Sequence, residues 1–266
     1  MSIDRLLTIM TRLRDKQNGC PWDQQQSFQS LIPFTLEEAY EVADTIEQGD
    51  WQHLPDELGD LLFQVVFYAE IAREQQLFDF NDITNAISEK LIRRHPHVFA
   101  NEKIASIKEQ SQAWENHKRQ ERQQSGQSDH MQQSELDGIS KQLPALVRAQ
   151  KLQRRAAHNG FDWEEIESVF NKLNEEIREL QSAMQNNDAS EIQDELGDVI
   201  FTCVNLARFL EVDAEQALRL ANNKFENRFQ KLERHVKKQN KLLSDLSLSD
   251  MDSIWEQVKA DEKNHQ

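Results

Sequence analysis

Residues 37–41 read EEAYE and residues 56–63 read DELGDLLF, and the pattern returns as EEIRE at residues 175–179 and DELGDVIF at residues 194–201. In each copy, the second Glu of EExxE stands 19 positions before the Glu of ExxD. One offset relates both acids, because 176 − 38 and 195 − 57 are both 138. A solenoid repeats every 20–50 residues or so. The longer period therefore indicates the duplication of a whole domain of ordinary size.

The repeat extends beyond the acidic residues, with short insertions that change the offset slightly. Residues that match between the copies are Asn18, Gly19 and Trp22 with Asn159, Gly160 and Trp163, and Lys90 and Arg94 with Lys224 and Arg228. We therefore expect an N-terminal domain at residues 1–120 and a C-terminal domain at residues 141–266. Residues 121–140 are rich in Gln and Ser and poor in large apolar side chains. This composition predicts a polar, flexible linker.

Apolar residues recur at i, i+3 and i+4 along the chain, and alternating strand patterns are absent. We predict an all-α protein made of two tandem copies of a small helical bundle. In the first copy, helices are expected at residues 3–15 and 35–48, with Thr35 as an N-cap that forms a capping box with Glu38. A further helix, with Pro55 in its first turn, is apolar on almost every face. It should lie at the centre of its bundle.

Composition excludes several classes of protein. The 266 residues carry a net charge of −16 without a visible basic stripe, which disfavours nucleic acid and anionic membranes as partners. The chain shows no signal region and no apolar run near 18–20 residues, so we expect a cytoplasmic protein. Its two cysteines, Cys20 and Cys203, are not equivalent in the repeat, which disfavours a disulfide framework. A P-loop motif is absent.

The repeated acids have the spacing of metal ligands. On a helix, residues i and i+3 share one face and are separated by about 4.5 Å along the axis. Two such pairs on antiparallel helices would form a cage of carboxylate oxygens, which Mg²⁺ and Mn²⁺ prefer. A di-iron site would show Glu-x-x-His, and zinc would bring Cys or His ligands, and neither pattern is present. The candidate ligands are Glu176, Glu179, Glu195 and Asp198, and in the first copy Glu38, Glu41, Glu57 and Asp60.

Basic residues near the acids indicate a phosphate-bearing ligand. Lys224 and Arg228 stand one turn apart, and so do Trp255 and Lys259. The two lysines and the arginine can bind nucleotide phosphates, and Trp255 offers an aromatic face. The alternatives are a solvated basic stripe and, for Trp255, an ordinary core position. Lys172 lies one turn before Glu176, where the first copy has Phe34. A phosphate contact by this lysine would favour the C-terminal copy as the working site.

Several strings resemble the MazG-type nucleoside triphosphate pyrophosphohydrolases, and especially their two-domain bacterial members. They are NGCPWD, TLEEAYEV, GDLLFQVVFYA and RRHPHVF, and the resemblance covers nearly the whole chain. It implies Mg²⁺ held by the second and third Glu of EExxE and both acids of ExxD. It also implies hydrolysis of NTPs and dNTPs to monophosphate and pyrophosphate, by attack of metal-bound water at the α-phosphorus. Glu175, Glu176 and Glu179 are then the expected catalytic residues.

The family resemblance also implies a homodimer and hydrolysis in the C-terminal copy, and a role in cleaning the nucleotide pool. Broad apolar faces around residues 58–72 and 196–210 agree with a dimer. Two alternatives stay open at this point. The protein could bind metal and nucleotide as an interaction or sensor protein without turnover, or it could act only on dUTP or a modified nucleotide.

Overall fold

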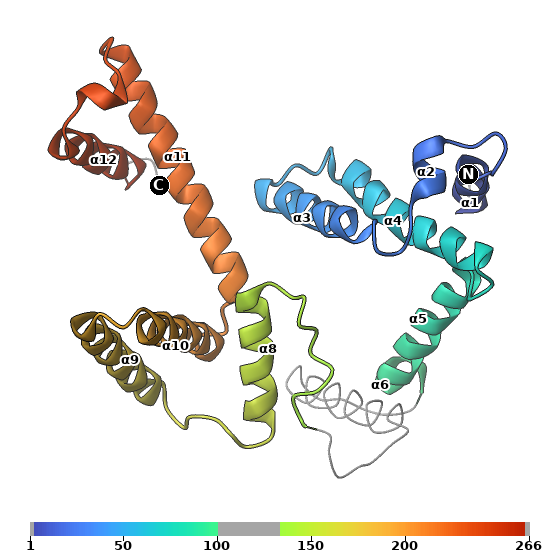
Figure 1. The fold of residues 1–266 in the computed structure, drawn as a ribbon, viewed down its shortest axis with the longest axis horizontal. Coiled ribbons are helices and arrows are strands. Elements are labelled where there is room, and N and C mark those ends of the chain that lie inside the picture. The colour runs from blue at the N-terminus through green and yellow to red at the C-terminus, as the bar shows by residue number, and fades with distance from the viewer. Residues whose placement is uncertain (1–2, 101–133, 264–266) are drawn as a thin grey trace. The chain divides into compact units, whose positions relative to one another are not determined.

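The computed structural model describes residues 3–100 and 134–263, and every regular element in these two ranges is a helix (Figure 1). The all-α prediction is therefore confirmed for this part of the chain. The chain divides into two compact units, residues 1–121 and 122–266. Of the predicted linker, residues 121–133 lie outside the described ranges, and residues 134–140 form turns. In the described ranges, the helices are too short or too polar to cross a membrane.

Unit 1 is built around one central helix, α4, as the sequence predicts. The helices are α1 (Ile3–Leu13), α2 (Pro21–Gln25), α3 (Ile32–Gln48), α4 (Leu54–Glu74), α5 (Phe80–Arg94) and α6 (Pro96–Phe99). Helices α1, α3 and α5 all pack on α4. The core combines Val66, Phe67 and Ile71 of α4 with Met10 and Leu31. The C-terminal half of α4 is thus buried on all sides, whereas the apolar residues Leu58, Leu62 and Val65 are exposed.

The start of α3 corrects one sequence prediction. The helix begins at Ile32 with Pro33 in its first turn, so Thr35 lies inside the helix and is not its N-cap. A proline is favourable there because its missing N–H would have no helical partner. The Thr35 hydroxyl donates to the Leu31 carbonyl oxygen at 3.0 Å and lies 2.9 Å from the Tyr68 hydroxyl of α4. This residue therefore helps to fasten α3 to α4.

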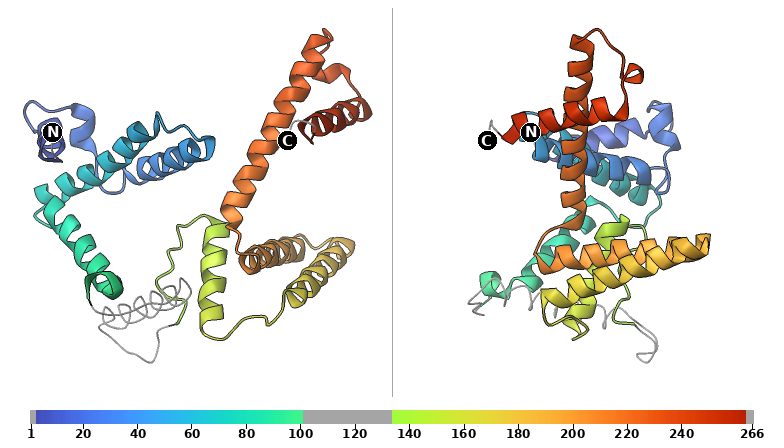
Figure 2. Two further views of the ribbon diagram at one scale, coloured as in Figure 1. Left: turned by 180° about the vertical axis from the view of Figure 1, so that it is seen from behind. Right: turned by 90° about the vertical axis from the view of Figure 1, so that its left-hand side faces the viewer.

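Unit 2 repeats the helix pair that carries the acids. Its elements are α8 (Ala145–His158), α9 (Ile166–Asn186), α10 (Ala189–Phe209), α11 (Ala214–Lys238), the short 3₁₀ helix η1 (Leu243–Asp245) and α12 (Leu248–Lys263). Asn187 ends α9 in the left-handed region at φ 55°, and Asp188 caps α10 by accepting from two backbone N–H groups. This tight connection lays α9 and α10 side by side and antiparallel (Figure 2). The antiparallel arrangement on which a carboxylate cage depends is therefore present in this unit.

Candidate active site

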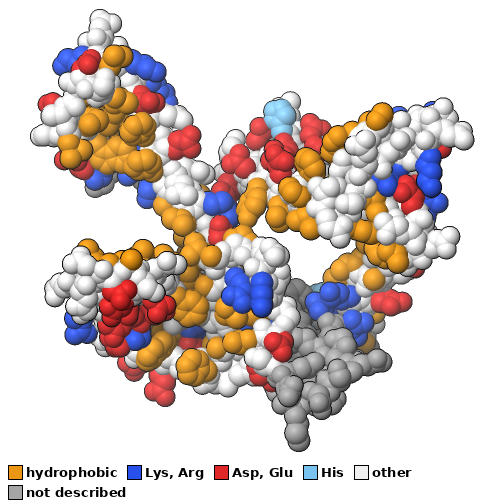
Figure 3. All heavy atoms as spheres, viewed as in Figure 1, with side chains coloured by type: hydrophobic (Ala, Val, Ile, Leu, Met, Phe, Trp, Pro, Cys, Tyr) orange, Lys and Arg blue, Asp and Glu red, His pale blue; other side chains and the backbone are white. Residues whose placement is uncertain are grey.

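Three of the predicted ligands of unit 2 converge between α9 and α10. Glu176 and Glu179 lie on α9 and Glu195 on α10, and each offers a carboxylate oxygen within 4.8 Å of the others. Glu176 is buried. Asp198 follows Glu195 by one turn and lines an adjoining cavity. Side chains of Asp and Glu gather over this helix pair in Figure 3.

The crowding of these carboxylates favours the binding of a cation. A hydrogen bond with Glu176 raises the pKa of Glu179, and desolvation and the charge of Glu176 add to the effect. Desolvation also raises the pKa of Glu195, as do the charges of Glu179, Glu176 and Asp198. Both shifts reflect the loss of hydration at these carboxylates together with the negative charge collected around them. A divalent cation would offset that charge, and the donors are all oxygen atoms, as Mg²⁺ requires.

Lys172 supplies one positive charge to this cluster. Its Nζ lies 2.7 Å from Oε1 of Glu175 and 2.9 Å from Oε1 of Glu176. Hydrogen bonds to these two carboxylates raise the pKa of Lys172, and its ammonium lowers the pKa of Glu175. The ammonium would therefore share Glu176 with a metal ion held by the acids.

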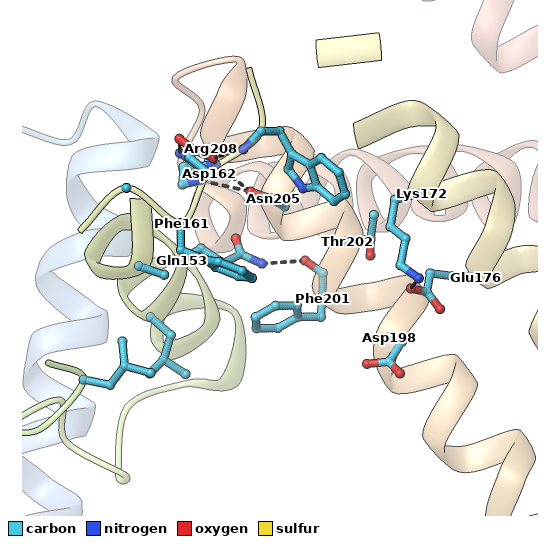
Figure 4. Close-up of a pocket in the computed structure, with 15 residues that line it drawn as sticks. Gln153, Phe161, Asp162, Lys172, Glu176, Asp198, Phe201, Thr202, Asn205 and Arg208 are labelled. Atoms are coloured by element: carbon cyan, nitrogen blue, oxygen red, sulfur yellow. Dashed lines mark hydrogen bonds and ion pairs between the residues drawn. The ribbon is translucent and has the colours of Figure 1, made fainter. Parts of the chain in front are cut away.

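A cavity of about 560 Å³ adjoins the acids (Figure 4). Lys172, Glu176 and Asp198 form one side of it, and Phe161 and Phe201 line the part beyond them. Trp163 and Leu152 complete this apolar part. A space of this size, with charged groups at one end and aromatic surface at the other, is typical of a small-molecule site.

The loop between α8 and α9 is held in place by Arg208 of α10. The Arg208 guanidinium forms a two-pronged ion pair with Asp162, with Nη1 3.0 Å from Oδ2. Asn205 accepts from Nε and Nη2 of the same guanidinium at 3.0 and 2.8 Å. Because Asp162 stands between Phe161 and Trp163, this contact fixes the aromatic wall of the cavity.

Comparison with known proteins agrees with this geometry. The sequence-family model called MazG nucleotide pyrophosphohydrolase domain matches residues 26–99 and 164–232, one segment in each copy. The chain belongs to the MazG family. A nucleoside triphosphate pyrophosphohydrolase of Escherichia coli (strain K12) is 50% identical over 262 residues, which are 98% of each chain. A Thermotoga maritima protein, called nucleoside triphosphate pyrophosphohydrolase/pyrophosphatase MazG, is 41% identical over 96% of this chain and 95% of its own. The predicted family and enzyme class are confirmed.

The other MazG copy, in unit 1, keeps the acids but surrounds them differently. Glu38, Glu41 and Glu57 bring carboxylate oxygens within 4.8 Å of one another. Desolvation and the charges of Asp60 and Glu41 raise the pKa of Glu38. This acidic cluster therefore also favours a cation, and it retains the pattern of the family.

The space beside the unit 1 acids is occupied by aromatic rings. At the 138-residue offset, Phe34 takes the place of Lys172, and Phe67 takes the place of Asn205. The ring centroid of Trp22 lies 5.6 Å from that of Phe34 and 6.3 Å from that of Phe67, in edge-to-face arrangements. Phe67 is fully buried. Phe67 belongs to the core and Phe34 packs against it, whereas Trp22 is 49% exposed, so aromatic side chains stand in the first copy where the second has Lys172 and Asn205.

The predicted phosphate-binding residues of α11 and α12 do not line the cavity. Nε of Arg228 donates to Glu262 at 2.8 Å, and Nζ of Lys259 lies 2.7 Å from Glu256. Trp255 packs on the core of Leu232, Val236 and Ile254, and its ring lies 5.3 Å from Phe225. Lys224 lies on α11, exposed and one turn before Arg228. Within one chain, these four residues therefore form a separate surface.

Sequence reasoning missed the residues that shape the cavity. Asn205 and Arg208 lie on α10, far in sequence from the loop they adjoin, and Gln153 lies on α8, directly before that loop, but contacts α10. A signal existed for the loop, because NGFDW replaces the first copy's NGCPW and introduces Phe161 and Asp162. Their partner, Arg208, could have been suspected because the first copy has Glu70 at that offset.

Proposed function

We propose that the protein hydrolyses nucleoside and deoxynucleoside triphosphates to a monophosphate and pyrophosphate at the site of unit 2. The observation that carries this is the junction of an oxygen-only acid cage with a cavity that has a lysine at its entrance and aromatic rings beyond. The triphosphate would lie against the acids and Lys172, and the base would lie in the aromatic part. Bases stack favourably on such rings whatever their identity, so the arrangement supports activity on several nucleotides.

The cage fits Mg²⁺, with Mn²⁺ as a substitute. Glu176, Glu179, Glu195 and Asp198 are the residues that would hold it. Bound Mg²⁺ would offset the charge of the phosphates and activate water for attack at the α-phosphorus. The protein's own contribution is position and charge: the acids fix the reacting end, and Lys172 is within reach of a phosphate oxygen when it leaves Glu176. Glu175 holds Lys172 near that place by the ion pair at 2.7 Å.

Hydrolysis is assigned to the C-terminal copy alone. Both copies have the acids, and in unit 2 they adjoin a nucleotide-sized cavity and a lysine, where unit 1 has Phe34 in place of that lysine. In unit 1, a bound nucleotide would have to displace Phe34 and Phe67 from the core. Removing a buried phenylalanine typically costs about 3–5 kcal/mol. The first copy is therefore proposed to have a structural or regulatory role.

A second copy of the chain is proposed to complete the site. Lys224, Arg228, Trp255 and Lys259 lie away from the cavity of their own unit, yet have the character of phosphate-binding residues. Exposed apolar side chains on α10 and α11, including Leu196, Ile200 and Phe225, offer surface for such a contact. Light scattering should give a mass near twice the 31.2 kDa of one chain. A mass of one chain at micromolar concentration would contradict this part of the proposal.

The test is a screen for pyrophosphate release over common and damaged NTPs and dNTPs, with and without Mg²⁺. We expect Mg²⁺-dependent release by the wild type and its near-complete loss in Glu176→Ala and Asp198→Ala. Circular dichroism should show unchanged helix content in both variants. A protein that binds nucleotide with Mg²⁺ but releases no pyrophosphate would instead be the sensor considered above. Release of pyrophosphate from dUTP or one modified nucleotide alone would support an enzyme with a narrow substrate range.

A further inference from the structure

We propose that Gln153 recognises the edge of the base in this site: its side-chain oxygen accepts a hydrogen bond from a base N–H group. This rests on the proposed function, since it takes the cavity to hold the nucleoside part of the substrate. Two observations support it. The side-chain oxygen of Gln153 is buried without a hydrogen-bond partner, and a hydrogen bond from its side-chain nitrogen fixes the orientation of the amide.

The acceptor is Oε1 of Gln153. The residue lies on α8, is only 7% exposed and lines the cavity. In the described part of the chain, Oε1 is buried and has no hydrogen-bond partner. Nearly all buried polar atoms of folded proteins are paired, so an exception calls for a reason. Because Oε1 is buried in the free protein, the cavity wall must shift slightly before a donor on a bound ligand can become its partner.

The orientation of the amide is fixed by Phe201. Nε2 of Gln153 donates to the backbone oxygen of Phe201 at 2.8 Å, which Figure 4 shows as a dashed line. Exchanging the two amide atoms would place Oε1 against that oxygen, and two acceptors repel. The amide thus cannot turn over to suit a different ligand. Gln153 presents a fixed acceptor, which favours a ligand with a donor and disfavours one with an oxygen at the same place.

The base is the part of a nucleotide that fits this acceptor. Phe161 is 85% exposed and Trp163 is 43% exposed, so flat aromatic surface is uncovered beside Gln153. Ionised phosphates have few donors to offer, whereas each common base carries an N–H group on its edge. In adenine and cytosine this group is the exocyclic amine. Sugar hydroxyls are the other donors of a nucleotide. The deoxynucleotides among the substrates below test whether a hydroxyl, and not the base, is the partner of Gln153.

The test compares substrates that differ by one amino group. For the wild type, kcat/KM should fall about 5- to 150-fold from ATP to the purine riboside triphosphate that lacks the 6-amino group, because the buried acceptor then stays unpaired. CTP and its analogue without the 4-amino group should differ in the same sense. Replacing ATP by dATP or 3′-deoxy-ATP should change little. This series needs no variant and therefore does not depend on the folding of a mutant.

Gln153→Met keeps the length of the side chain and removes the acceptor. For this variant, kcat/KM for ATP divided by kcat/KM for the purine analogue should approach one. The matched control is Gln150→Met on the same helix. Gln150 is also buried, but both ends of its amide are satisfied, by the Val212 oxygen at 2.7 Å and the Ala214 N–H at 3.4 Å. This control should keep the wild-type ratio even if its melting temperature falls.

The inference is overturned if Gln153→Met discriminates as the wild type does, or if the wild type discriminates by sugar hydroxyl and not by amino group. Failure of the proposed function looks different, since no nucleotide would then yield pyrophosphate. In that case, calorimetric binding of ATP and the purine analogue to the wild type and Gln153→Met gives the same comparison without turnover. An equal affinity of the wild type for both ligands would reject the role of Gln153.

Discussion

Replacing Lys172 by methionine is expected to change two properties in opposite directions. In the free protein, Nζ of Lys172 lies 2.9 Å from Oε1 of Glu176, a proposed metal ligand. The ammonium and the metal ion therefore compete for one carboxylate. Once a nucleotide binds, the same ammonium becomes a partner for its phosphates. Lys172→Met should thus bind Mg²⁺ more tightly when no nucleotide is present, and should turn over nucleotides more slowly.

The sizes of the two effects follow from the exposure of the contacts. The side chain of Lys172 is 34% exposed while that of Glu176 is 7% exposed, so the ion pair is partly screened by water. Such pairs contribute up to about 1 kcal/mol, which corresponds to a gain in metal affinity of about 2- to 5-fold. A charge-assisted contact to a phosphate is worth about 1.5–3 kcal/mol, so kcat/KM should fall about 10- to 150-fold.

Isothermal titration with Mn²⁺ or Mg²⁺ alone measures the first effect, and pyrophosphate release at saturating Mg²⁺ measures the second. Lys172→Arg should keep the competition for Glu176, because it retains the charge. Lys151→Met is the control for removing a lysine, since Lys151 is exposed on α8 and does not line the cavity. Weaker metal binding by Lys172→Met, or a kcat/KM within twofold of the wild type, would refute the reasoning.

Three other outcomes test the remaining parts of the proposal. Glu176→Ala with Glu195→Ala should abolish pyrophosphate release, whereas Glu38→Ala with Glu57→Ala should leave most of it; equal losses would mean two working sites. Asn205→Phe, which copies Phe67 of the first copy, should lower kcat/KM at least tenfold by filling the cavity, with metal affinity unchanged in calorimetry. Glu195→Gln should raise the melting temperature of the metal-free protein at neutral pH, and Mg²⁺ should stabilise the variant less than the wild type.

The sign of the last prediction follows from the raised pKa of Glu195. The folded protein holds the Glu195 proton up to a higher pH than the unfolded chain does. Stability therefore falls as pH rises from the unfolded pKa to the folded pKa, and the loss is complete above the folded value. Below the unfolded pKa, the carboxyl is protonated in both states, so the advantage of Glu195→Gln should vanish there. A thermal shift series from acid to neutral pH shows whether the difference follows this course.

The acids were predictable from sequence because their arrangement is local. Residues three apart on a helix share a face in any helix, so Glu176 and Glu179 follow from the periodicity alone. The apolar sequence after Asp60 likewise identified α4 as central without further information. Only the pairing of α9 with α10 was assumed, and a connection as short as Asn187–Asp188 leaves two neighbouring helices little choice but to lie antiparallel.

The cavity was not predictable, because its contacts join distant parts of the chain. Gln153 meets the Phe201 oxygen across 48 residues, and Arg208 meets Asp162 across 46. Periodicity indicates which face of a helix is apolar, but it does not say which buried glutamine gains a partner. Thr35 shows the same limit on a smaller scale. Its spacing to Glu38 fits a capping box, yet the helix starts earlier and Thr35 bonds to Tyr68, which is 33 residues away.

The two copies together show how one acidic pattern can serve different ends. In unit 1, a fully buried Phe67 joins Val66 and Ile71, so α4 stabilises its bundle with large apolar side chains. In unit 2, the equivalent of Phe67 is Asn205, and the buried residues of α10 are Thr202 and Val204. A cavity and polar groups on the central helix cost stability, so their presence in unit 2 requires a benefit. The proposed nucleotide binding would supply one, and the first copy would be free of that requirement.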